Sequence, residues 1–87
     1  MIYRDLDISD DCTIRTFDES INPIELQWHM DNEDRMIIAI EKTDWKIQLE
    51  NELPRELNTA VFIERGQWHR LIKGTYALKL KIVKKLK

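Results

Sequence analysis

The sequence predicts an all-β, single-domain fold: a small β-barrel or jelly roll of about seven to eight short strands. Short runs rich in β-branched and aromatic residues recur along the chain, and most are separated by turns that contain Asn, Asp or Gly. No stretch of ten residues has the apolar spacing of an amphipathic helix. The predicted strands cover residues 12–17, 24–29, 35–41, 45–50, 55–57, 60–63, 67–72 and 76–83.

The middle of the chain contains the strands that are expected to form the core. Residues 35–41 hold the densest apolar run, Met-Ile-Ile-Ala-Ile, which is typical of a strand buried on both faces, and residues 60–63 are predicted to be similar. Residues 45–50 alternate between apolar and polar side chains. We therefore expect three residues of this strand to face the interior: Trp45, Ile47 and Leu49.

The domain is expected to comprise residues 12–87, preceded by a loose N-terminal arm of polar and acidic residues 1–11. The single cysteine, Cys12, cannot form an internal disulfide, and the N-terminal residues do not resemble a signal peptide. Both observations favour a reduced, cytoplasmic protein. No apolar run reaches the roughly 18 residues that span a bilayer, so no membrane association is expected.

Charge is distributed unevenly along the chain. Residues 1–34 carry ten acidic and two basic residues, whereas residues 71–87 carry six lysines and no acid. Lysine alternates with apolar residues in Leu78–Ile82, which indicates the solvent-exposed face of a strand. We therefore do not expect this tail to bind nucleic acid, which the acidic first third of the chain would also oppose.

Two histidines and one aspartate are the candidate metal ligands. His29 and Asp31 are two residues apart, so on a strand their side chains would lie on the same face. His69, the only other histidine, lies in a second predicted strand. Two imidazoles and one carboxylate form the ligand set of non-haem iron enzymes, and they also suit manganese, nickel or zinc. The sequence predicts a divalent metal site without identifying the metal.

The order of these motifs resembles the cupin superfamily of small β-barrels. The first cupin motif begins His-x-His with a Glu three or four residues later; here His29 matches the first histidine, and Asp31 and Arg35 stand at the other positions. Residues 60–70 are similar to the second motif, with His69 at its histidine and Glu64 where proline is usual. The resemblance implies a cupin-like barrel that binds a small molecule in its interior, either as a metal-dependent oxygenase or isomerase or as a binding protein without catalysis.

Arg35 leaves a second interpretation open. If it points inward, a guanidinium lies beside the ligands and cannot coordinate a cation. Arg35 would then pair with Asp31, or with Asp34, and the barrel would be a metal-free module that binds a small anion. In both interpretations Arg35 and the inward-facing Trp45 are the candidate ligand-binding residues, and no catalytic residue is predicted.

An apolar outer surface predicts a homodimer. If Arg35 points inward, then Met36, Ile38 and Ile40 point outward, and Trp28 and Trp68 flank the inward histidines and also point outward. Monomers rarely expose a large apolar patch. We expect a second copy of the chain, or the N-terminal segment, to cover this face.

Overall fold

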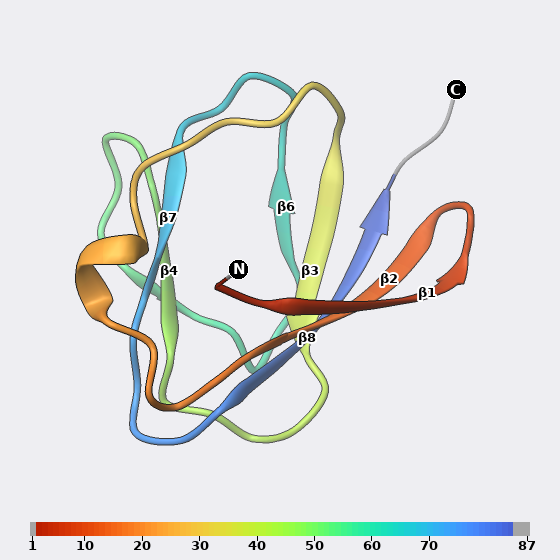
Figure 1. Cartoon of the computed structure of the whole chain (residues 1–87). Coiled ribbons are helices and arrows are strands. Elements are labelled where there is room, and N and C mark those ends of the chain that lie inside the picture. The colour runs from red at the N-terminus through yellow and green to blue at the C-terminus, as the bar shows by residue number, and fades with distance from the viewer. Residues whose placement is uncertain (1, 85–87) are drawn as a thin grey trace.

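Two antiparallel β-sheets pack face to face in the computed structural model, which describes residues 2–84 (Figure 1). The larger sheet has five strands in the order β1-β2-β8-β3-β6, and the smaller has three in the order β5-β4-β7. The strands are β1 (Arg4–Ser9), β2 (Cys12–Phe17), β3 (Arg35–Ala39), β4 (Lys46–Leu49), β5 (Arg55–Glu56), β6 (Val61–Ile63), β7 (His69–Ile72) and β8 (Leu78–Lys84). The predicted all-β fold of short strands is confirmed.

The core lies between the sheets and is built from every second residue of the strands. Leu78, Leu80 and Ile82 of β8 are buried, and Ile37 of β3 pairs with Ile82 across the ladder. The smaller sheet contributes the three predicted inward residues, Trp45, Ile47 and Leu49. These side chains form one apolar cluster that holds the two layers together.

The two strands predicted to be buried on both faces are buried on one face only. Met36 of β3 and Phe62 of β6 are paired across the ladder, and both are exposed. The prediction was wrong because both strands belong to the larger sheet, which has one face toward the core and one toward solvent. Continuous apolar sequence here gives an apolar outer face.

The strand predicted for residues 24–29 is a short 3₁₀ helix followed by irregular chain. The helix, Pro23–Glu25, begins where the Asn22 side chain accepts a hydrogen bond from the Ile24 backbone N–H. Proline at the first helical position suits this geometry, because its missing N–H has no partner to lose there. Only His29 of the predicted strand makes a β-bridge.

The expected loose arm contains a strand, β1, which forms the edge of the larger sheet. It pairs with β2 from Arg4 opposite Thr16 to Ser9 opposite Cys12. All six residues of β1 are exposed, so it has no buried apolar face for a sequence pattern to reveal. Because β1 extends the sheet edge, the N-terminal segment does not cover the outer face, and that expectation was wrong.

The described residues contain no helix long and apolar enough to cross a membrane. Of the lysine-rich tail, Lys79 and Lys81 are exposed on β8, as predicted, while Lys85 and Lys87 lie outside the described residues.

Candidate metal centre

His29 and His69 are placed side by side by the backbone. The two residues form an isolated antiparallel bridge in which each N–H donates to the other's carbonyl, both at 2.9 Å. Directly opposed residues on neighbouring strands project their side chains to the same face. The imidazole rings consequently lie with their centroids 4.3 Å apart. The pairing brings together two histidines that are forty residues apart in sequence.

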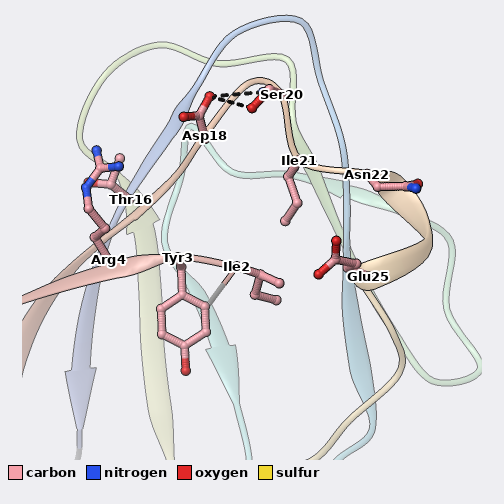
Figure 2. Close-up of a pocket in the computed structure, with 9 residues that line it drawn as sticks. All are labelled: Ile2, Tyr3, Arg4, Thr16, Asp18, Ser20, Ile21, Asn22 and Glu25. Atoms are coloured by element: carbon pink, nitrogen blue, oxygen red, sulfur yellow. Dashed lines mark hydrogen bonds between the residues drawn. The ribbon is translucent and has the colours of Figure 1, made fainter.

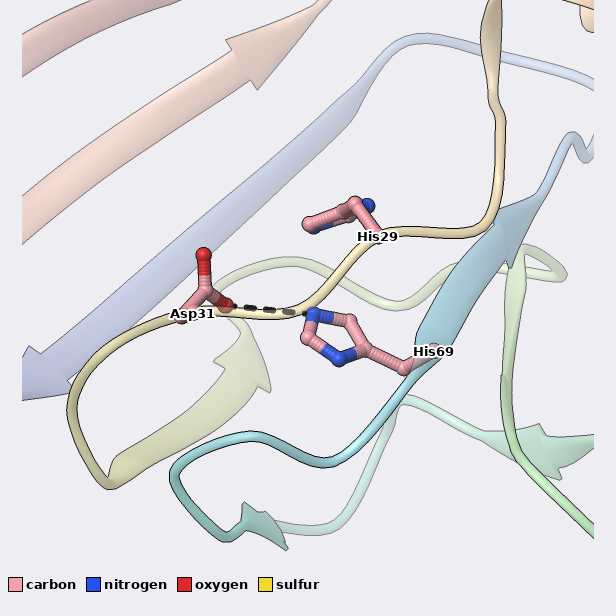
Figure 3. A group of neighbouring side chains, drawn as sticks. All are labelled: His29, Asp31 and His69. Atoms are coloured by element: carbon pink, nitrogen blue, oxygen red, sulfur yellow. Dashed lines mark ion pairs between the residues drawn. The ribbon is translucent and has the colours of Figure 1, made fainter.

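Asp31 completes the cluster from the chain that follows His29. Its backbone carbonyl accepts a 2.8 Å hydrogen bond from the N–H of Gly66, in the turn that precedes β7. Gly66 has φ +79°, a conformation that glycine adopts readily. The Asp31 carboxylate points toward the His69 ring, with Oδ2 3.3 Å from Nε2 (Figure 3). One potential ligand atom from each residue lies within 4.8 Å of the other two, so the three predicted residues form a cluster that could hold a metal ion.

Backbone carbonyls fix the tautomer of both histidines. Nδ1 of His69 lies 2.8 Å from the Gln67 carbonyl, and Nδ1 of His29 lies 3.2 Å from the Gln27 carbonyl. A carbonyl oxygen only accepts, so each Nδ1 carries the proton. In the neutral ring Nε2 then holds an unshared electron pair. Hydrogen bonding of the second ring nitrogen in this way is usual for metal-binding histidines.

His69 is held in the neutral form. Burial of the ring is the main cause that lowers its pKa below the ordinary value of 6.5, and the neighbouring His29 and Arg35 lower it further. The hydrogen bond to Gln67 and the charge of Asp31 act in the opposite direction without cancelling the shift. At neutral pH the electron pair of Nε2 is therefore free.

A buried oxygen shows that this cluster fits a cation. Oδ2 of Asp31 is buried and makes no hydrogen bond, although His69 Nε2 and Arg35 Nη1 lie 3.3 and 3.5 Å away. The two distances satisfy an ion-pair criterion, but neither contact has hydrogen-bond geometry. A carboxylate oxygen thus faces the electron pair of a neutral imidazole, an unfavourable pairing unless a cation lies between them.

Arg35 has a partner that the sequence interpretation missed. Its Nε donates to Glu33 Oε2 at 2.9 Å, and its contact with Asp31 is longer, at 3.5 Å. The predicted pair with Asp31 is present only as this longer ion-pair contact, without hydrogen bonds. The alternative partner, Asp34, instead accepts a 2.8 Å hydrogen bond from the Arg65 backbone N–H. Because Glu33 takes the hydrogen bond from Nε, Arg35 gives Asp31 only the longer ion-pair contact and no hydrogen bond.

A cavity of about 360 Å³ opens beside the cluster. His29, Asp31 and Arg35 line it, together with Arg15 of β2 and Tyr3, which precedes β1. A smaller space of about 50 Å³ adjoins it between the sheets and reaches His69. The larger volume lies in the range of small-molecule sites.

Trp45, predicted to contact a ligand, lines neither of these spaces. Its side chain is 1% exposed and belongs to the core, where its Nε1–H donates to the Tyr76 carbonyl and its ring lies 5.9 Å from that of Phe17. Trp28 and Trp68 are exposed, as expected, and the guanidinium of Arg70 stacks on Trp28.

A second cavity of about 360 Å³ lies next to the first, and the two share Ile2, Tyr3 and Glu25 in their walls (Figure 2). None of the three candidate metal ligands lines it. Asp18 accepts hydrogen bonds from Ser20 at its edge. The first cavity is therefore the one that adjoins the candidate centre.

Arg15 and Tyr3 are lining residues that the sequence interpretation did not identify. Arg15 occupies an inward position of β2, between the buried residues Thr13 and Phe17. A charged residue at an inward position of a predicted strand is a signal that could have been noticed. Tyr3 gave no comparable signal, because it precedes a strand whose residues are all exposed.

No protein-family model matches the chain, and no curated protein matches its sequence. Solved structures do match. An RmlC-like cupin family protein with a double-stranded β-helix fold from Methanocaldococcus jannaschii aligns with a TM-score of 0.67 and 15% identity, over 95% of this chain and 77% of that one. This chain has a cupin fold.

Two further cupin-fold matches are informative. A cupin-2 domain protein from Shewanella frigidimarina aligns with a TM-score of 0.62 and 17% identity, over 93% of this chain and 76% of that one. Fe(II) HppE in complex with its substrate aligns with a TM-score of 0.67 and 18% identity over 97% of this chain. The chain spans only 53% of the length of HppE. At these identities the matches establish the fold alone.

Proposed function

We propose that this cupin-fold protein binds one divalent metal ion through His29, Asp31 and His69 and a small molecule in the adjoining cavity. The observation that carries the proposal is the buried Asp31 Oδ2, which has no hydrogen bond and faces the free electron pair of His69 Nε2. The ligand set is that of iron, manganese, nickel or zinc sites. Iron gains support from the Fe(II) named for one structural match.

The charges around the cluster favour an anionic ligand once a metal is bound. Arg15, Arg35 and Lys84 are balanced by Asp5, Asp31 and Glu33, each acid lying within 4.0 Å of one of these bases. Glu25, which also lines the cavity, brings the sum of these charges to minus one without an ion. A divalent cation would give the site a net positive charge, which an anionic small molecule would neutralise.

The residues of the chain define what the site could do with a bound metal. Three protein ligands leave coordination positions open, and a metal would supply Lewis-acid activation of an oxygen atom there. Arg35, held by Glu33, also lines the cavity and adds a positive charge to its wall. Oxygenase or isomerase chemistry would also need an acid or base beyond the metal ligands, so the proposal stops at metal and ligand binding.

Metal content of the untagged protein tests the proposal. After reconstitution with iron, manganese, nickel or zinc and removal of excess ion, mass spectrometry should find about one ion per chain. Asp31→Asn should reduce this content at least tenfold, because the amide is a much weaker ligand of nearly the same shape. Asp34→Asn is the matched control and should retain the metal. Wild-type protein that binds none of the four ions, or an Asp31→Asn variant with full content, would overturn the site.

A further inference from the structure

Arg15 is a charged residue at an inward position of the larger sheet. It stands opposite Leu80 of β8, which pairs in turn with Ala39 of β3, so its neighbours on that side of the inner row are apolar. Its side chain is 18% exposed. Arg15 lines both the larger cavity and the smaller space beside the candidate metal centre. A guanidinium in this position requires a carboxylate or similar anion as its partner.

The partner of Arg15 comes from the exposed edge strand. Asp5 of β1 lies directly opposite Arg15, and its two carboxylate oxygens accept hydrogen bonds from Nε and Nη2 at 2.8 and 2.9 Å. The face of the guanidinium stacks on Tyr3, 3.8 Å from the ring centroid. Arg15 is therefore oriented to hold a carboxylate in bidentate fashion within the wall of the cavity.

The Asp5 carboxylate can be replaced at little cost. Its side chain is 33% exposed, so water can solvate this carboxylate once it leaves Arg15. Its strand pairs on one side only, as the outermost strand of the sheet. A carboxylate supplied by a ligand would form the same two hydrogen bonds and release Asp5 to water.

Arg15 is better placed than Arg35 to receive this ligand. Arg35 is held by Glu33 and lies near Asp31, so a ligand would have to compete with two carboxylates. The side chain of Asp31 is less exposed than that of Asp5, and the side chain of Glu33 is about as exposed as that of Asp5. Burial lowers the pKa of Arg15, but the hydrogen bonds and charge of Asp5, with smaller contributions from Tyr3 and Asp31, raise it above its ordinary value, so the guanidinium stays charged.

We propose that Arg15 is the anion-recognition residue of the cavity, that the ligand is a small carboxylate, and that Asp5 occupies this position until the ligand displaces it. The inference rests on the proposed function in taking this cavity as the ligand site. It identifies the chemical class of the ligand and assigns Asp5 an autoinhibitory contact.

Titration with succinate tests the inference, with the uncharged succinamide as the control ligand. Arginine Nε–H resonances, observed by NMR in metal-free and zinc-loaded protein, should show the Arg15 signal moving to saturation with succinate and not with succinamide. Asp5→Asn should bind succinate several-fold more tightly, because the competing carboxylate is gone. Arg15→Gln should weaken binding about tenfold or more, and Arg65→Gln, a matched exposed variant, should leave it unchanged.

The outcomes separate this inference from the proposed function. Arg15→Gln should retain the wild-type metal content, so lost succinate affinity with intact metal binding supports the role of Arg15. Equal succinate affinity in wild type and Arg15→Gln, or no gain in a folded Asp5→Asn variant, would overturn it. Tighter binding of inorganic phosphate than of succinate, with the same dependence on Arg15, would overturn the assignment to carboxylates. Absence of metal would refute the proposed function while leaving the comparison of these variants readable.

Discussion

Replacing Asp31 by asparagine should stabilise the metal-free protein while removing its metal site. In the wild type, Oδ2 of Asp31 is buried without a hydrogen bond and faces the unprotonated Nε2 of His69 at 3.3 Å. Asparagine has almost the same shape and no charge, and its Nδ2–H can donate to that nitrogen. The substitution turns a repulsive contact into a hydrogen bond.

The expected gain can be worked from the contacts of the two states. A buried polar group without a hydrogen bond costs about 1–3 kcal/mol, and relief of this cost favours the variant. The variant loses the ion pair of Asp31 with Arg35, which at 3.5 Å lacks hydrogen-bond geometry, and such a pair contributes at most about 1 kcal/mol. The free energy of unfolding should rise by about 1–2 kcal/mol.

Urea unfolding of the chelator-treated protein measures this difference. With an m value of about 1 kcal/mol/M, the midpoint of Asp31→Asn should exceed that of the wild type by about 1 M or more. Zinc should reverse the order, since a ligand at 100 times its Kd stabilises the wild type by about 2.7 kcal/mol and should not stabilise the variant. Asp34→Asn serves as the control for an Asp-to-Asn change outside the cluster.

One result would refute the reasoning about the buried oxygen. If chelated Asp31→Asn unfolds at lower urea than the chelated wild type by 1 M or more, the carboxylate is already well paired in the metal-free protein. A protonated His69 together with Arg35 would then satisfy Asp31, and the argument that the cluster calls for a metal would fail.

Three further predictions concern the rest of the molecule. Gly74→Ala should lower the melting temperature far more than Gly66→Ala. A Cβ at residue 74 would overlap Trp45 and Asp44, whereas at residue 66 only the positive φ opposes a side chain, at a cost of about 1 kcal/mol. Similar losses in the two variants would contradict this. Hydrogen bonds from the hydroxyl and N–H of Thr75 lower the pKa of Asp44 below 3.8. The stability that they supply is present above that pH and is lost as pH falls through the folded pKa. Urea unfolding at pH 5 and pH 3 should therefore show a smaller acid-induced loss of stability in Asp44→Asn than in the wild type, and equal losses would refute the assignment. The homodimer stays a prediction: light scattering should give twice the chain mass for the wild type and the monomer mass for Ile38→Lys on the outer face of β3, and a monodisperse wild-type monomer would exclude it.

The fold could be predicted because most strands have a local signal. Trp45, Ile47 and Leu49 alternate with polar residues, and the structure buries all three. The edge strand β1 had no such signal, since none of its residues is buried and its stability comes from pairing with β2. A strand that forms only by pairing with its neighbour cannot be predicted from the pattern of its own residues.

The candidate ligands were also predicted, although one reason given for them was wrong. The spacing argument placed His29 and Asp31 on one face as if a strand ran through both, yet only His29 makes a β-bridge, and the position of Asp31 depends on a hydrogen bond from Gly66. The Glu33 partner of Arg35 was missed because it lies in the turn and its side chain folds back across two residues. Ion pairs of this kind depend on side-chain conformations, which the period of a strand does not determine.

The bridge between His29 and His69 sets the spacing of the site independently of the side chains that stand at these two positions. The two reciprocal hydrogen bonds involve backbone atoms alone, so they fix the distance between positions 29 and 69 whatever side chains stand there. Non-proline substitutions at these positions can thus change the donor atoms, from nitrogen to oxygen or sulfur, while the frame that presents them is retained. If the proposed metal binds here, substitutions at single positions would be expected to alter the preference for one metal over another without a new fold.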